Sequence, residues 1–502
     1  MIVLRNGTIY DGTGAPGRPG NVLLDGEKIA DVGAFEPPAD AQAIDCRGLA
    51  ISPGFIDAHS HSDLQVLENR REKVLQGVTS EVVGNCGFSA FPAAADRRGL
   101  YEYSNGILFG DDRWGWATAA EYLEETRRRA RLANVVSLVG HGTLRIAHVG
   151  HHLGKLSEEH VSAMEQTLDQ ALAEGAAGFS TGLMYSPGES APFDELERLC
   201  RVVARRGKVY ATHMRDYMGK LVEAVEEQLE LARRTGCRLQ ISHMQAVGEA
   251  NWPLQQQALE LIERAHEDGI DVAFDCYPYV AGSTVMTQIL PQWALGGGLE
   301  AMLARLADPS ERARIERETV VSQGWRNLLV SAVGSAANAN LVGMSLEEIG
   351  TQRNREPVEV VMDLLLEERG DVTILEYNQS EENLRQTVTH PLANIISDGF
   401  YVKGRPHPRL HGAFACLLGD ICRQRGWMTL PEAVRKTTDL PARRMGIPLR
   451  GRLERGWFAD VAVFDPEVAG SAASYDNPQV DPVGIRHVFR NGQALIGGAT
   501  AS

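Results

Sequence analysis

The stretch Gly54-Phe-Ile-Asp57-Ala-His59-Ser-His61 ends a short apolar run with two histidines. Side chains two residues apart on a strand share a face, so Asp57, His59 and His61 are expected to point together. Two imidazoles side by side suit a divalent metal, although two neighbouring histidines without further ligands are also found in ordinary protein cores. The rest of the chain therefore has to show whether further ligands converge on the same place.

The same pattern recurs through the middle of the chain. Short apolar runs that end in polar residues alternate with long helical stretches over about 350 residues, which indicates parallel βαβ units. The nine strand candidates are Gly54–His59, Val78–Val83, Val135–Val139, Ala177–Thr181, Val209–His213, Leu239–His243, Val272–Cys276, Val372–Tyr377 and Asn394–Ser397. The pattern predicts an α/β fold of the (β/α)8 barrel type, which needs one strand fewer, and does not say which candidate is extra.

The two ends of the chain share a different texture, with short strands broken by glycine. Arg5-Asn6-Gly7 and Arg490-Asn491-Gly492 are Asn-Gly turn signals flanked by strand-forming residues. Such fragments bury little surface alone, so one small β domain assembled from both termini is expected. We predict that it comprises residues 1–52 and 440–502, with a barrel at 53–439 and an insertion at about 285–365.

Charge and cysteine content narrow the classes of partner. The 502 residues include 50 Lys and Arg against 66 Asp and Glu, a net charge of −16, which argues against nucleic acid or an anionic membrane as the main partner. The charge-free stretch from Cys276 to Leu299 is interrupted by proline and glycine and is not expected to span a membrane. Seven scattered cysteines favour a reducing, cytoplasmic location. The oligomeric state stays open.

Four further strand ends carry residues with ligand chemistry: Cys86, His213, His243 and Asp398. Each has an ordinary alternative, since a buried cysteine or histidine is often core and an aspartate often caps a helix. In a parallel barrel, however, the carboxyl ends of all strands meet at one rim. One thiolate, four imidazoles and a carboxylate on one rim predict a zinc hydrolase site with an open coordination position.

Several motifs then carry a resemblance that runs from Met1 to about Gly498. The His59-Ser-His61 stretch, the strand-end histidines and Ser397-Asp398-Gly399 resemble the amidohydrolase superfamily. Six motifs look like those of the N-acyl-D-amino acid deacylases: Gly84-Asn-Cys86-Gly-Phe-Ser, Val139-Gly-His-Gly-Thr-Leu-Arg145, Gly182-Leu-Met-Tyr185-Ser-Pro-Gly188, Thr212-His-Met-Arg-Asp216, Asp275-Cys-Tyr277-Pro-Tyr and His407-Pro-Arg409-Leu-His-Gly.

The resemblance implies a distorted TIM-type barrel with a small β-sandwich from both termini. It implies one tightly bound zinc at Cys86, His213 and His243, while His59, His61 and Asp398 face a second site that is weak or empty. A metal-activated water would attack the amide of an N-acyl-D-amino acid. Asp398 would act as general base and then as general acid, releasing a D-amino acid and a carboxylic acid.

The family's substrate carboxylate site falls on Arg409, with Tyr185, Tyr277 and Ser283. Arginine suits this role because its planar fork binds both carboxylate oxygens. Some family members have a lysine where this chain has Gln245, so acidic D-side chains are less favoured here than neutral or hydrophobic ones.

Two other functions remain open at this point. A cyclic-amide hydrolase of the hydantoinase or dihydroorotase type shares the barrel, although Cys86 and the absence of a bridging lysine at the end of Ala177–Thr181 disfavour it. A non-catalytic metal-binding protein with an amidohydrolase fold is the second alternative, although every expected ligand position is filled.

Overall fold

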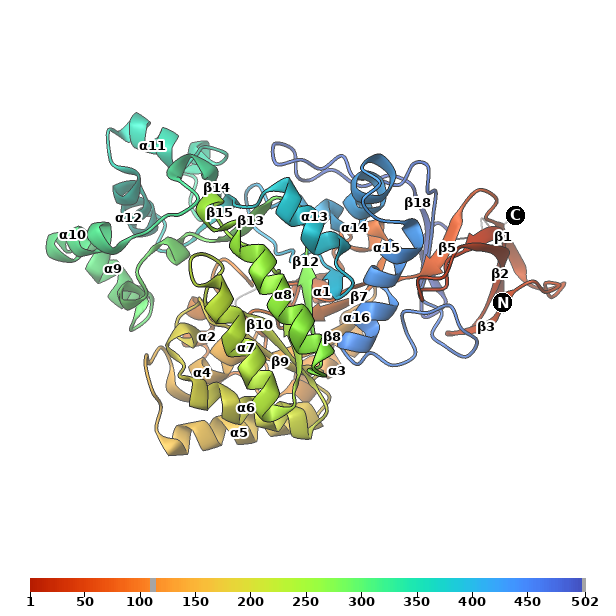
Figure 1. Ribbon diagram of the computed structural model, residues 1–502, viewed down its shortest axis with the longest axis horizontal. Helices are drawn as coiled ribbons and strands as arrows, with labels where there is room; N and C mark the ends of the chain where they lie inside the picture. The colour runs from red at the N-terminus through yellow and green to blue at the C-terminus, as the bar shows by residue number, and fades with distance from the viewer. Residues whose placement is uncertain (109–113, 499–502) are drawn as a thin grey trace.

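The computed structural model describes residues 1–108 and 114–498, with a parallel barrel at its centre (Figure 1). The barrel strands are β6 (Phe55–Asp57), β7 (Val78–Val83), β8 (Asn134–Gly140), β9 (Gly178–Gly182), β10 (Val209–His213), β11 (Arg238–Ile241), β12 (Val272–Cys276) and β16 (Ala393–Ile395). Every neighbouring pair is parallel, so the strands end at one rim. The predicted α/β barrel fold is confirmed.

The barrel is irregular where β6 meets β16. Ser60 forms an isolated parallel bridge with Gly399, just beyond the ends of both strands. The backbone N–H of Asp398 donates to the carbonyl of His59 at 2.9 Å, and that of His61 donates to the carbonyl of Gly399 at 3.0 Å. This seam fixes the two histidines of the opening motif beside Asp398.

Helices cover the outside of the barrel, and the strands between them are buried on both faces. Strands β7, β9, β10 and β12 are buried at every position, as expected for a covered parallel sheet. Helix α6 buries Leu196, Leu199 and Val203, which recur at the helical period. The barrel helices are α1 (Gln65–Glu68), α2 (Arg98–Ser104), α3 (Ala119–Arg129), α4 (His141–Val149), α5 (Glu158–Ala173), α6 (Phe193–Arg205), α7 (Leu221–Thr235), α8 (Leu254–Glu267), α13 (Glu381–Thr389), α14 (Arg409–Cys416), α15 (Leu430–Thr437) and α16 (Asp439–Arg444).

The ninth strand candidate, Val372–Tyr377, is the one outside the barrel. It forms β15 at the centre of an antiparallel sheet, between β13 (Ala281–Val285) and β14 (Leu328–Val333). Four helices form a separate cluster with this sheet at the left of Figure 1: α9 (Leu299–Ala307), α10 (Pro309–Glu318), α11 (Leu346–Arg353) and α12 (Pro357–Glu367). The sheet extends past 285–365 at both ends, and the domain bounds remain predictions.

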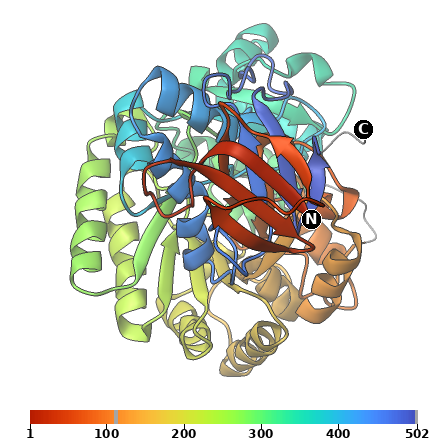
Figure 2. The same cartoon turned by 90° about the vertical axis from the view of Figure 1, so that its right-hand side faces the viewer.

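Both termini contribute to one eight-stranded sheet, whose red and blue strands lie side by side in Figure 2. Its strands are β1 (Ile2–Ile9), β2 (Arg18–Asp25), β3 (Lys28–Gly33), β4 (Gln42–Asp45), β5 (Ala50–Pro53), β17 (Val461–Phe464), β18 (Ile485–Arg490) and β19 (Gln493–Ile496). Asn491-Gly492 is the predicted turn, with φ of 48° and 74°. Asn6-Gly7 instead lies at a register shift within β1, because the flanking segments continue on the same partner strand.

The charge-free stretch from Cys276 to Leu299 contains β13 and short helical turns. Pro278, Pro291 and the glycines at 296–298 interrupt it. Within the described residues, no helix is both long enough and apolar enough to cross a membrane.

Candidate metal centre and active site

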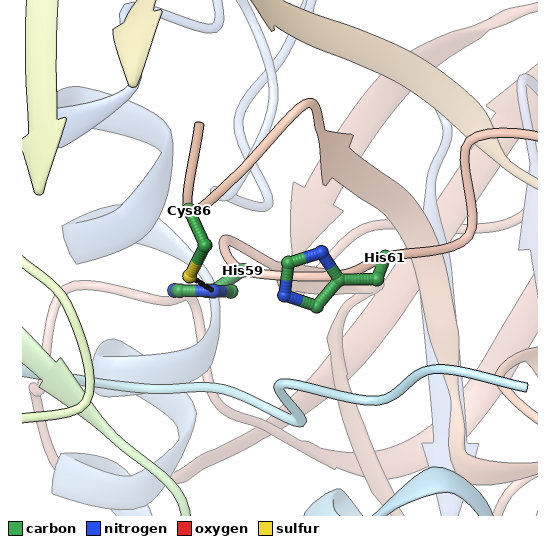
Figure 3. A group of neighbouring side chains, drawn as sticks. All are labelled: His59, His61 and Cys86. Atoms are coloured by element: carbon green, nitrogen blue, oxygen red, sulfur yellow. Dashed lines mark hydrogen bonds between the residues drawn. The ribbon is translucent and has the colours of Figure 1, made fainter. Parts of the chain in front are cut away.

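The predicted metal ligands meet at the carboxyl-terminal rim of the barrel. The donor atoms of Cys86, His213 and His243 all lie within 4.8 Å of one another, and so do those of Cys86, His59 and His61. Figure 3 shows the sulfur of Cys86 against the ring of His59, with His61 beside it. The sequence therefore brings together residues from four strand ends.

The distances within the first group match a small tetrahedral site. Cys86 Sγ lies 3.5 Å from His243 Nε2, and His213 Nδ1 lies 3.0 Å from the same nitrogen. A tetrahedral zinc with usual bond lengths requires about 3.5 Å between sulfur and nitrogen ligands and about 3.3 Å between two nitrogens. One sulfur and two imidazole nitrogens are also the donor types that zinc prefers. The donor set fits a bound zinc ion.

The backbone is strained at three of these positions. Cys86, His243 and Asp398 have φ values of 51°, 34° and 48°, in the left-handed region that residues with a side chain rarely occupy. A Cβ on the neighbouring Gly84 would lie 2.3 Å from the carbonyl oxygen of Leu138, so the Cys86 loop is pressed against the next strand. Strain of this kind collects at functional sites, where it directs side chains that regular strand geometry would turn away.

Asp275 orients two of the histidines, a role that sequence reasoning missed. Its Oδ1 accepts the backbone N–H of His243 at 2.6 Å and lies 3.4 Å from His59 Nδ1, while Oδ2 accepts Gln240 Nε2 at 3.1 Å. Asp275 is fully buried near the end of β12. Its only sequence signal was its place in the motif with Tyr277.

Asp57 is not a member of either ligand group. It pairs with the buried ammonium group of Lys73 and accepts the backbone N–H of Ser397 at 3.0 Å. Strand β6 ends at Asp57, and the chain bends after it. Asp57 instead holds the segment that carries Asp398.

Asp398 lies between the histidines and Arg409. Its Oδ1 is 3.3 Å from Nε2 of both His59 and His61, and its Oδ2 is 2.9 Å from Arg409 Nη1. Burial opposes ionisation, but the charges of Arg409 and His59 hold the pKa of Asp398 well below its usual value. The carboxylate is thus ionised.

The two imidazoles of the first group are neutral. Burial, and then the neighbouring His243, lower the pKa of His213 well below 6.5. Burial lowers the pKa of His243 to about 4. Neutral imidazole is the form that binds a metal ion.

The predicted substrate residues line the same cavity, which measures about 120 Å³. The Arg409 guanidinium lies 4.6 Å from the centre of the Tyr277 ring, and its Nε has no hydrogen-bond partner within the described chain. The Tyr185 hydroxyl is 3.2 Å from Thr284 Oγ1. Ser283 lines the cavity, but its hydroxyl donates to the carbonyl of Ile374 at 2.9 Å.

Gln245 lies against these groups. Its Oε1 accepts the Tyr277 hydroxyl at 3.0 Å and Gln379 Nε2 at 2.8 Å. The side chain at this position is therefore a neutral amide rather than the ammonium group of a lysine.

Comparison with known proteins supports the geometry. Residues 42–496 match the model of the amidohydrolase family. The chain belongs to the amidohydrolase family. The motif resemblance to its N-acyl-D-amino acid deacylases is also confirmed.

Two relatives come from Alcaligenes xylosoxydans xylosoxydans. N-acyl-D-glutamate deacylase is 35% identical over 99% of this chain and 93% of its own, and D-aminoacylase is 32% identical over 98% and 93%. The crystal structure of N-acyl-D-glutamate deacylase from Bordetella bronchiseptica, with zinc and a phosphonate that mimics the tetrahedral intermediate, superposes with a TM-score of 0.86. It is 32% identical over 100% of this chain and 97% of that one.

Proposed function

We propose that this amidohydrolase cleaves N-acyl-D-amino acids into a D-amino acid and a carboxylic acid with one tightly bound zinc ion. The observation that carries the proposal is the position of Asp398, which lies between the ligand group and Arg409 in one cavity. An amide bond held by its neighbouring carboxylate at Arg409 would thus lie beside both the metal and a proton acceptor.

Cys86, His213 and His243 are the ligands that we assign to the tight site. His59, His61 and Asp398 face a second position, for which we retain weak or no occupancy because Asp398 is engaged by Arg409. When bound, zinc supplies Lewis acidity toward the amide carbonyl and makes water more acidic.

The protein's own residues supply binding and proton transfer. Arg409 would bind the substrate carboxylate with its unpaired Nε and its neighbouring Nη donors. Asp398 would take the proton of the attacking water and deliver it to the departing amine nitrogen. Tyr185 and Tyr277, whose hydroxyl pKa values are raised by burial, remain neutral and wall the carboxylate site.

The remaining cavity wall is largely apolar, which favours neutral D-side chains. The apolar lining residues are Ile107, Met184, Met218, Val247, Ile289, Val320, Val321, Leu328 and Phe400. Burial of an aliphatic side chain such as that of methionine against this wall would stabilise the bound substrate by about 25 cal/mol per Å² of apolar surface removed from water.

The alternatives account less well for the site. The end of β9 carries Gly182 where a bridging lysine would stand, and the relatives matched over the whole chain are named as deacylases, so a cyclic-amide hydrolase is not favoured. A non-catalytic role does not explain why an ionised Asp398 lies beside a complete ligand group. The cytoplasmic location and the absence of a nucleic-acid partner remain proposals from the sequence.

The test is turnover of N-acetyl-D-methionine and N-acetyl-L-methionine by zinc-loaded protein. The proposal expects release of free methionine from the D form and at least about a 100-fold lower kcat/KM for the L form. Equal turnover of the two enantiomers would remove it. Preferential ring-opening of a hydantoin would favour the cyclic-amide alternative.

A further inference from the structure

The cavity contains a second carboxylate that neither the metal group nor the proton-transfer step uses. Glu376 is partly buried near the end of β15, where its backbone pairs with Gly282 of β13 and Leu328 of β14. Both β13 and β15 belong to the insertion sheet, so this sheet supplies one wall of the cavity. Burial raises the pKa of Glu376 to about 7, against the opposing influences of Asn378 and Arg409.

Glu376 lacks the positive partner that Asp398 has. Arg409 is the one arginine or lysine among the described residues that line the cavity, and its guanidinium is 2.9 Å from Asp398. No ion pair joins Glu376 to a cation within residues 1–108 and 114–498. Its hydrogen-bonding neighbour is the neutral side chain of Asn378.

Glu376 is also close to the place assigned to the substrate carboxylate. Glu376 lines the same cavity as Tyr185 and Tyr277, and a Cβ on Gly282, which pairs with Glu376 across the sheet, would lie 3.1 Å from the Tyr277 hydroxyl. The Tyr277 ring in turn lies 4.6 Å below the Arg409 guanidinium. A substrate side chain begins one bond from the carbon that bears the carboxylate. A substrate side chain would therefore extend into the cavity that Glu376 lines.

Because of these charges, the cavity should bind acidic and neutral substrate side chains with different affinities. The substrate carboxylate already uses Arg409, so a second carboxylate on the side chain would find no cation and would face Glu376. Like charges in a desolvated site repel strongly. A neutral side chain of the same size that ends in an N–H donor would instead meet an acceptor.

We propose that Glu376 is a specificity-determining residue that rejects N-acyl-D-amino acids with acidic side chains and accepts those ending in a hydrogen-bond donor. The inference rests on the proposed function. It assigns to the insertion sheet a part in choosing the substrate, in addition to closing the cavity.

The experiment uses N-acetyl-D-glutamine and N-acetyl-D-glutamate, which share a shape and differ in charge. Zinc-loaded wild type is expected to favour glutamine at least about ten-fold in kcat/KM. Glu376→Gln should raise kcat/KM for the glutamate substrate about ten-fold or more, while N-acetyl-D-methionine changes less than about three-fold. Glu316→Gln, an exposed position on α10, removes the same charge away from the cavity and should alter neither ratio.

The outcomes separate the two proposals. If wild type turns over N-acetyl-D-methionine but treats the glutamine and glutamate substrates alike, the role of Glu376 is overturned without any variant. An unchanged ratio in folded, zinc-loaded Glu376→Gln overturns it as well. If wild type turns over none of the three substrates, the proposed function fails and this inference fails with it.

Discussion

Replacement of Arg409 by methionine isolates the contact that we assign to the substrate carboxylate. Arg409 is 1% exposed, its Nη1 is 2.9 Å from Asp398, and its Nε has no partner among the described residues. Methionine fills much of the volume of the arginine stem and removes the charged fork. The substitution therefore deletes the carboxylate contact with limited loss of packing.

The size of the effect follows from the hydrogen bonds at stake. A hydrogen bond to a charged group contributes about 1.5–3 kcal/mol, and a bidentate contact contains two. Loss of both raises the barrier by about 3–6 kcal/mol, and kcat/KM should fall about 10²- to 10⁴-fold. Arg409→Lys keeps the charge without the fork and should lose about 10- to 100-fold.

The assay compares N-acetyl-D-methionine with its C-terminal amide, which lacks the carboxylate. Wild type should have a much higher kcat/KM for the acid than for the amide. For Arg409→Met the two kcat/KM values should agree within about three-fold. Because removal of one partner leaves Asp398 buried without its cation, melting temperature and zinc content are measured alongside. An equal loss on both substrates would show that Arg409 acts through Asp398 alone and would refute its binding role.

Three further predictions concern the proton acceptor, the ligand group and pH. Asp398→Asn should keep its zinc by elemental analysis but lose about 10²- to 10⁴-fold in kcat, and near-wild-type turnover would exclude it as general base. Cys86→Ser should lose most of its bound zinc at equal protein concentration, whereas Cys422→Ser, which lies outside the site, should retain it. Equal zinc retention by the two variants would contradict the assignment of Cys86 as a ligand. The preference for N-acetyl-D-glutamine over N-acetyl-D-glutamate should grow between pH 6 and pH 8, because Glu376, with a pKa of about 7, is largely protonated at the lower pH and ionised at the higher. Tyr185 and Tyr277 stay neutral throughout this range, so a flat ratio would count against Glu376.

The sequence was sufficient to predict which residues converge at the rim. Cys86, His243 and Asp398 follow strands of a parallel barrel and His213 ends one. Parallel strands bring their carboxyl ends together whatever the exact strand bounds. The prediction thus depended on chain order and residue type, both of which are visible without coordinates.

Features that depend on pairing between distant segments were not predictable. Val372–Tyr377 has the apolar pattern of a barrel strand, and only its antiparallel pairing with β13 and β14 places it outside. Glu376 was overlooked inside that candidate, although a charged residue in an apolar strand is a signal in its own right. Asp275 and Asp57 both lie near strand ends, and their different partners became evident only from the side-chain geometry.

In the proposed function, one zinc ion at Cys86, His213 and His243 suffices for hydrolysis of an N-acyl-D-amino acid. The most direct measurement is the rate of N-acetyl-D-methionine hydrolysis as zinc is titrated into chelator-treated protein. Activity should be absent without metal, rise with added zinc and reach its maximum near one equivalent per chain. Activity that persists without metal, or that requires two equivalents, would contradict it.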